Sequence, residues 1–187
     1  MSSIVDSLMG MLGGDTLNKI SQQIGVPQEK AQQALPGVIA VLTGALAKES
    51  SQKQGAQALS SALAKDHDGS ILNNLSDYIS NYQSGDGNGI LSHTLGNSRP
   101  AVEKSLSQKT GLDMGTIGNL LTMAAPIIMG ALGKTQRQNG LDASGLSNLL
   151  GQESSQAQSL FPGLGGILGQ ILGGSQAQQQ GQVPQQT

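Results

Sequence analysis

The chain has 187 residues, a formal net charge of −2 at pH 7, and only 12% charged and 2% aromatic residues. It contains no cysteine, which excludes disulfides, thiol catalysis, iron–sulfur clusters and cysteine-ligated zinc. Its lysines and arginines are scattered, whereas a nucleic-acid-binding surface needs clustered cations that neutralise phosphates. We therefore expect no nucleic-acid partner. Because aromatic side chains are few, the core must use Leu, Ile, Ala, Val and Met, which favours closely packed helices.

The first predicted helices lie between residues 15 and 48. Apolar residues recur at helical spacing over residues 15–24, and Gly25 predicts a helix end in the left-handed conformation. A second short helix is expected over residues 27–35, where proline suits the first turn. A third, over residues 36–48, is apolar on nearly all sides, which is typical of a buried central helix.

The chain contains an internal duplication. Residues 24–48 align without a gap to residues 110–134, at an offset of 86 positions, and Gly25 pairs with Gly111. The likeness continues downstream, where Leu59-Ser60 matches Leu146-Ser147. A repeat of this kind indicates a duplicated structural unit. We expect two similar halves, about residues 15–66 and 101–153, joined by a connector over residues 67–100 and packed into one core.

The second half predicts the same order of helices, with Asp113 as a helix N-cap. The expected ranges are 101–109, 113–121 and 123–134, with later short helices at 55–65 and 143–151. In the connector, Gly69 and Gly89 each precede a short amphipathic stretch, and residues 84–89 predict a flexible turn. The runs at 43–45 and 129–131 contain Gly-Ala pairs, which favours close contact between the two central helices.

The composition changes after residue 153, so we separate a domain over residues 1–153 from a segment over residues 154–187. Residues 160–174 are apolar, glycine-rich and uncharged, and residues 175–187 are nearly all Gln, Gly, Ala and Pro, a composition typical of disorder. If helical, the apolar segment presents an interaction patch to another chain or to a membrane surface. Its members are Leu160, Leu164, Ile167, Leu168 and Leu172. The alternative is that the segment folds back onto the core.

The string Asp66-His67-Asp68 is the most site-like in the chain. A calcium loop needs further oxygen ligands and a late Glu, which this string lacks. We favour a solvated turn in which Asp68 caps the helix that follows. His67 and His93 would be two ligands of one metal if the connector helices packed together, but zinc sites use three or four. We therefore predict no catalytic residue, no metal and no cofactor.

Two stretches carry a family resemblance: GILSHTLGNSRPAVEKSLSQKTGLDMGTIGNLLTMAAPIIMGALGK at residues 89–134 and GLDASGLSNLLGQE at residues 140–153. They resemble the bacterial domain-of-unknown-function family 937 and, more distantly, the YidB-like proteins. The resemblance extends over about residues 10–153. It implies a bacterial, all-helical protein, and it brings no enzymatic activity, cofactor or catalytic residue. Some relatives join this domain to envelope-type modules.

Together these observations predict an all-α, duplicated, pseudo-symmetric bundle of short helices with a disordered tail. We expect a non-catalytic interaction or structural protein whose partner is itself or another protein, and not an enzyme. No apolar run reaches the length of a membrane span, so we expect a cytoplasmic location. The alternative is a peripheral cell-envelope protein that contacts lipid through its C-terminal apolar segment.

Overall fold

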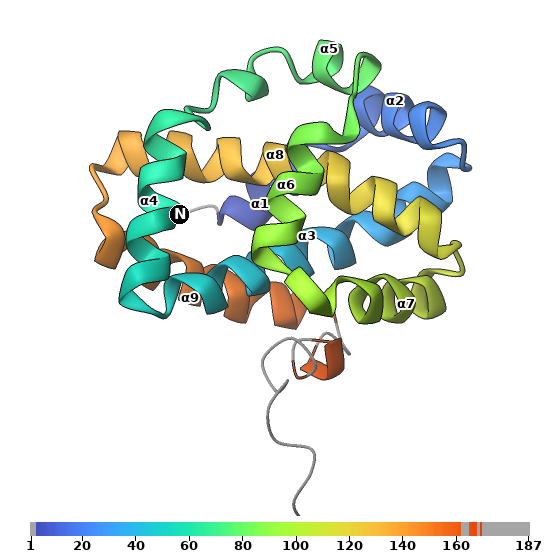
Figure 1. Cartoon of the computed structure of the whole chain (residues 1–187). Coiled ribbons are helices and arrows are strands. Elements are labelled where there is room, and N and C mark those ends of the chain that lie inside the picture. Colours follow the sequence, from blue (N-terminus) through green and yellow to red (C-terminus); the bar gives the residue numbers. More distant parts are fainter. Residues whose placement is uncertain (1–2, 162–164, 168, 170–187) are drawn as a thin grey trace, which may run out of the picture.

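In the computed structural model, residues 3–161, 165–167 and 169 are described, and the regular structure in that part of the chain is helical (Figure 1). The predicted all-α fold is confirmed. The α-helices are α1 (Ile4–Met11), α2 (Gly14–Ile24), α3 (Gln28–Ser50), α4 (Lys53–Lys65), α5 (Leu75–Ser80), α6 (Ser84–Thr94), α7 (Arg99–Thr110), α8 (Met114–Asn139) and α9 (Ala143–Leu160). Two short 3-10 helices, η1 (Ser70–Leu72) and η2 (Gly96–Ser98), lie in the connector.

The duplicated sequences form matching helices. α2 ends at Gly25 and α7 ends at Gly111, and these glycines have φ angles of 73° and 70°, the left-handed region that favours glycine. The next helix, α3 or α8, begins three residues later in each half. Asp113 caps α8, as predicted, by accepting a hydrogen bond from the Thr116 amide at 2.9 Å. The repeat in the sequence is thus a repeat in the structure.

The predicted division of each central region into two short helices is wrong. α3 runs without a break through Pro36, and α8 runs through Pro126. A proline inside a helix costs about 3 kcal/mol, because it removes one hydrogen bond and its ring clashes with the preceding turn. The residues that follow Pro36 and surround Pro126 are buried. Burial of both helices therefore outweighs the local cost of the prolines.

α3 and α8 form the centre of the core, as the sequence predicted. Every residue over 37–46 and over 120–133 is buried. α8 is the one described helix that is long and apolar enough to cross a membrane, and 89% of its most apolar stretch is buried inside the fold. Its apolar character is therefore used for packing within the molecule.

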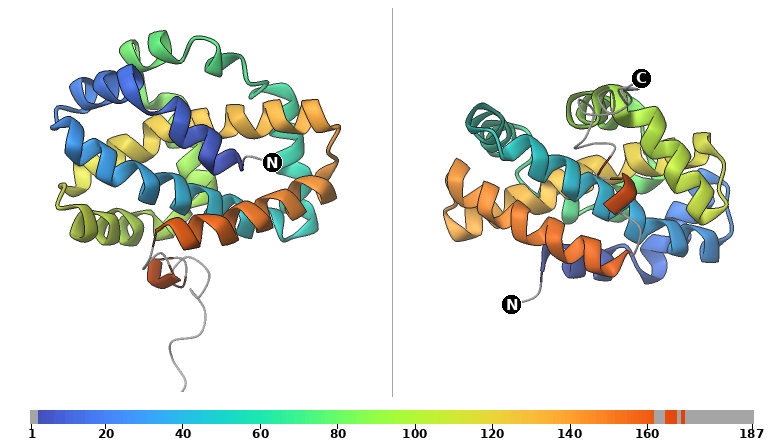
Figure 2. Two further views of the ribbon diagram at one scale, coloured as in Figure 1. Left: turned by 180° about the vertical axis from the view of Figure 1, so that it is seen from behind. Right: turned by 90° about the horizontal axis from the view of Figure 1, so that it is seen from below.

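The last helix of each half packs on the central helix of the other half. α9 lies along α3, α4 packs against α8, and α4 also contacts α9 (Figure 2). α9 continues to Leu160, and Ala157 within it is fully buried. The boundary expected at residue 153 therefore lies inside α9, and the two halves share one core.

α6 of the connector lies across α8 (Figure 1). The flexible turn predicted for residues 84–89 is wrong, since these residues form the first turns of α6. Gly87 explains the difference, because a Cβ there would lie only 1.9 Å from the carbonyl oxygen of Thr122 on α8. Gly87 therefore allows the two helices to approach closely, and this packing offsets the poor helix propensity of glycine.

The two central helices contact each other, as expected, but Gly130 does not make this contact. A Cβ on Gly130 would lie 2.5 Å from the Cγ2 atom of Ile71, so this glycine faces η1. Small residues on α8 therefore allow the connector to pack closely against this helix. This packing brings His67 close to the core.

Candidate functional site

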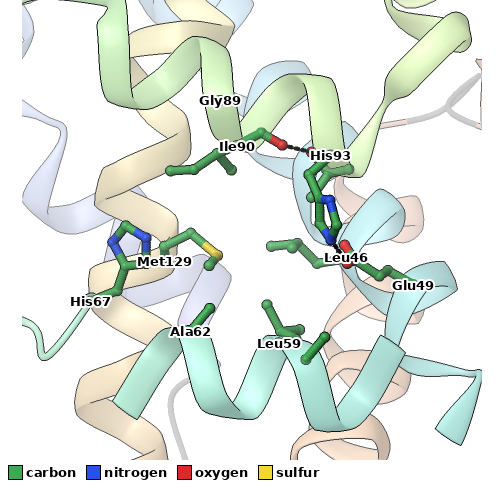
Figure 3. Close-up of a pocket in the computed structure, with 11 residues that line it drawn as sticks. Leu46, Glu49, Leu59, Ala62, His67, Gly89, Ile90, His93 and Met129 are labelled. Carbon is green, nitrogen blue, oxygen red and sulfur yellow. Dashed lines mark hydrogen bonds and ion pairs between the residues drawn. The ribbon is translucent and has the colours of Figure 1, made fainter. Parts of the chain in front are cut away.

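A pocket of about 190 Å³ lies between α3, α4, α6 and α8 (Figure 3). Most of its wall is apolar, and the polar side chains on it come from different elements. An apolar cavity of roughly 150 Å³ is large enough to hold benzene, so the pocket has room for a molecule of one ring. The lining residues are Leu46, Glu49, Ala58, Leu59, Ala62, His67, Gly89, Ile90, His93, Thr94 and Met129.

Glu49, near the end of α3, supplies the carboxylate of the pocket. Its Oε1 atom lies 2.9 Å from Nε2 of His93 on α6, and the Glu49 side chain is 17% exposed whereas that of His93 is 73% exposed. The second oxygen, Oε2, is buried and receives no hydrogen bond from the described residues. Burial raises the pKa of Glu49, and the neighbouring His93 acts in the opposite direction.

His67 lies on the opposite side of the pocket from His93, in the loop after α4, with its ring beside Met129 (Figure 3). Burial lowers the pKa of His67, and the charges of Asp66 and Asp86 oppose this shift. The neutral imidazole is therefore the main form at pH 7. The structure brings both histidines to one pocket, on separate walls.

The rest of the Asp66-His67-Asp68 string serves the turn after α4. Asp68 accepts a hydrogen bond from the Ser70 amide at 2.9 Å, and its carboxylate lies 3.8 Å from the Arg137 guanidinium. Hydrogen bonds from Ser70 lower the pKa of Asp68. Among the described residues, no group of three or more His, Cys, Asp or Glu side chains is arranged to hold a metal ion.

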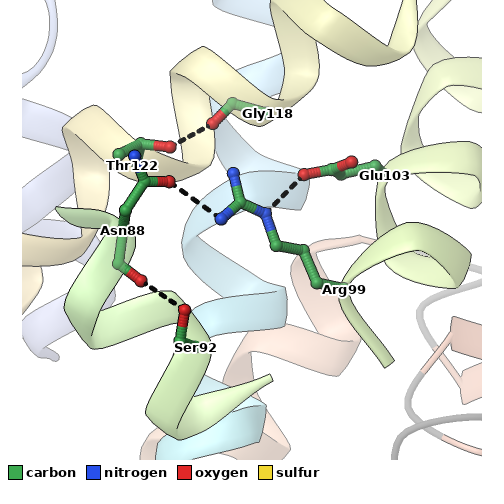
Figure 4. A network of polar contacts seen from close by, with 6 residues as sticks. All are labelled: Asn88, Ser92, Arg99, Glu103, Gly118 and Thr122. Carbon is green, nitrogen blue, oxygen red and sulfur yellow. Dashed lines mark hydrogen bonds and ion pairs between the residues drawn. The ribbon is translucent and has the colours of Figure 1, made fainter. Parts of the chain in front are cut away.

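A polar network fixes α6 beside the pocket (Figure 4). Arg99 donates to Glu103 at 2.7 Å and to the side-chain oxygen of Asn88 on α6 at 2.9 Å. Gly118 on α8 leaves room for this pair, because a Cβ there would lie 3.1 Å from Oε1 of Glu103. These hydrogen bonds join α6 to α7 beside α8, and they thereby hold the α6 wall of the pocket in place.

The apolar segment expected to mediate interactions is described in part. Ile167 is only 2% exposed and packs within the core, so this residue does not present an exposed surface. The preceding Phe161 lies against α3, with its ring 3.0 Å from where a Cβ of Gly37 would be. The side chain of Leu160 and all of Leu164, Leu168 and Leu172 lie outside the described residues.

Sequence reasoning identified His67 and His93 but missed Glu49. Glu49 follows Lys48 at the polar end of an apolar helix, where a charged residue is typical of a solvated helix end. Its proximity to His93 depends on how α6 packs, and the spacing of residues along the chain does not carry that information.

The comparisons with known proteins define a family. The model of a family described as bacterial protein of unknown function (DUF937) matches residues 6–135. The chain therefore belongs to this bacterial family. No curated protein and no solved structure matches the chain significantly.

Proposed function

We propose that this protein is a non-catalytic interaction protein that associates with a second copy of itself through residues 160–174. The observation that carries the proposal is the position of Ile167, which is seated in the core at 2% exposure although it belongs to this apolar segment. Phe161, at the start of the segment, is partly buried and packs against α3. The helical core thus provides an apolar binding surface for side chains of this segment.

A surface that binds this segment of its own chain can also bind the same segment of an identical chain. Exchange of an identical element between copies is a low-cost route to a dimer, because it uses contacts that the monomer already makes. Charged groups with partners inside the fold support a structural role: the buried Glu153 accepts hydrogen bonds from the amides of Ile4 and Val5, and the partly buried Arg99 pairs with Glu103. These groups stabilise helix termini and helix contacts.

Light scattering coupled to chromatography tests this proposal over a range of concentrations. We expect the native chain to form a concentration-dependent dimer, and we expect the triple change Leu164→Ser, Leu168→Ser and Leu172→Ser to abolish it. The matched control changes Gln178, Gln179 and Gln180 to Ser in the polar tail and should dimerise as the native chain does. A native chain that is monomeric at every concentration would contradict the proposal.

Contact with lipid is a second use of the same segment, because residues 160–174 contain no charged side chain. In this case the apolar residues would enter the interface of a membrane. Flotation with vesicles separates the two functions. The native chain floats and the triple serine variant does not if lipid is the partner, whereas a dimeric protein that stays at the bottom supports self-association.

A further inference from the structure

Glu49, which lines the pocket between α3, α4, α6 and α8, has a carboxylate oxygen that no described protein group satisfies. Thr94 donates its hydroxyl to the carbonyl of Ile90 at 2.8 Å, and Oε1 of Glu49 pairs with His93. Oε2 of Glu49 is buried without a hydrogen-bond donor. A buried acceptor without a donor is costly, and each such atom in a native structure calls for an explanation.

The charges around the pocket favour a donor and disfavour an anion. No lysine or arginine is among the described residues that line the pocket. His93 is the side chain on the wall that pairs with Glu49. It is mostly exposed, and it already contacts Oε1. An ionised carboxylate only accepts hydrogen bonds, whereas an ammonium group only donates them. The charge and the hydrogen-bonding capacity of the Glu49 carboxylate thus both favour an ammonium group on the ligand.

We propose that this pocket binds a small amine with an apolar body of about one ring, whose ammonium group pairs with the carboxylate of Glu49. The body would contact Leu59, Ala62 and Met129, which give the wall its apolar character (Figure 3). Mostly apolar walls with a few placed polar groups are the usual form of a small-molecule site. None of the described residues of 160–174 lines this pocket, and its test does not depend on self-association.

Three matched probes test the proposal on the full chain: benzylamine, toluene and benzoate. They share one ring and differ in the group attached to it. Isothermal titration gives the affinities, and the methyl signals of methionine in nuclear magnetic resonance spectra report whether Met129 is contacted. We expect benzylamine to bind and to shift the Met129 signal, and we expect toluene and benzoate to bind at least about tenfold more weakly, because each lacks the charged donor.

Two variants locate the contact. Glu49→Gln removes the charge and should weaken benzylamine binding about tenfold or more, whereas Glu29→Gln, an exposed change on the same helix, should leave it unchanged. Ala62→Leu fills the pocket from α4 and should abolish binding while the helical circular dichroism signal is retained. The proposal is overturned if benzylamine does not saturate, if benzoate or toluene binds equally well, or if either Glu49→Gln or Ala62→Leu leaves binding unchanged.

Discussion

Glycines on α8 determine how closely the connector approaches the core. A Cβ on Gly133 would lie 1.7 Å from the carbonyl oxygen of His67, and that oxygen belongs to the backbone. Gly151 on α9 is different, because nothing lies within 4 Å of the position of its Cβ. The two glycines therefore differ in environment although both lie inside helices.

We predict opposite effects for alanine at these two positions. Gly133→Ala forces the His67 loop away from α8 and should lower the free energy of unfolding by about 2 kcal/mol. Gly151→Ala meets no obstacle and should raise it by up to about 1 kcal/mol, because alanine favours a helix more than glycine. Denaturant titration of both variants measures the difference, and a loss of similar size at both positions would contradict the packing described for Gly133.

The two tyrosines make stability dependent on alkaline pH. Tyr78 donates to the carbonyl of Met123 at 3.2 Å and packs edge-on against Tyr82, with ring centroids 6.2 Å apart. Burial raises the pKa of both phenols. A group whose pKa is raised in the folded state contributes its stability below the unfolded pKa, which is about 10 for tyrosine, and that contribution is lost as the pH rises further.

We therefore expect neither tyrosine to ionise in the folded protein at its ordinary pKa. The chain has no tryptophan, so ultraviolet absorbance of the phenolate reports the two tyrosines directly. The free energy of unfolding should fall above a pH of about 10, and Tyr78→Phe should reduce that dependence. Ionisation of a tyrosine at its ordinary value, with the helical signal intact, would show that the rings are not buried as described.

At the scale of helices, Glu153 joins the last helix, α9, to the first, α1. Its carboxylate on α9 accepts hydrogen bonds from the amides of Ile4 and Val5, both at 3.0 Å, and the residue is 6% exposed. These amides belong to the first turn of α1, where a negative charge also interacts favourably with the helix dipole. Asp66, which lies opposite Glu153 in the repeat, is exposed at the end of α4.

Glu153→Ala should lower the free energy of unfolding by about 2 kcal/mol, because it leaves two backbone donors of α1 without an acceptor. Asp66→Ala is the matched control at the corresponding repeat position, and its effect should stay within about 0.5 kcal/mol. Denaturant unfolding gives both values. Equal effects at the two positions would mean that Glu153 does not hold α1.

At the scale of the whole molecule, the features that repeat along the sequence were predicted well. The helix ends at Gly25 and Gly111 and the buried central helices follow from local patterns, which the structure retains. The continuity of α3 through Pro36, the helix at residues 84–89 and the position of Glu49 depend on tertiary packing. The local preferences of proline and glycine predict against a continuous α3 and against a helix at residues 84–89. No local pattern indicates that Glu49 lies in the pocket.

Because helices of each half pack on the other half, we expect the core to open as one cooperative unit. α9 covers α3 and α4 covers α8, so neither central helix can lose its cover without disturbing the other half. Elements that open together show the same free energy of opening in native-state hydrogen exchange.

Hydrogen exchange under native conditions tests this cooperativity most directly. We predict that the slowest amides lie in residues 38–46 and 127–132, and that both sets exchange with the free energy of global unfolding. Rapid exchange in either stretch, or two separate opening energies for the two stretches, would contradict a single core shared by both halves.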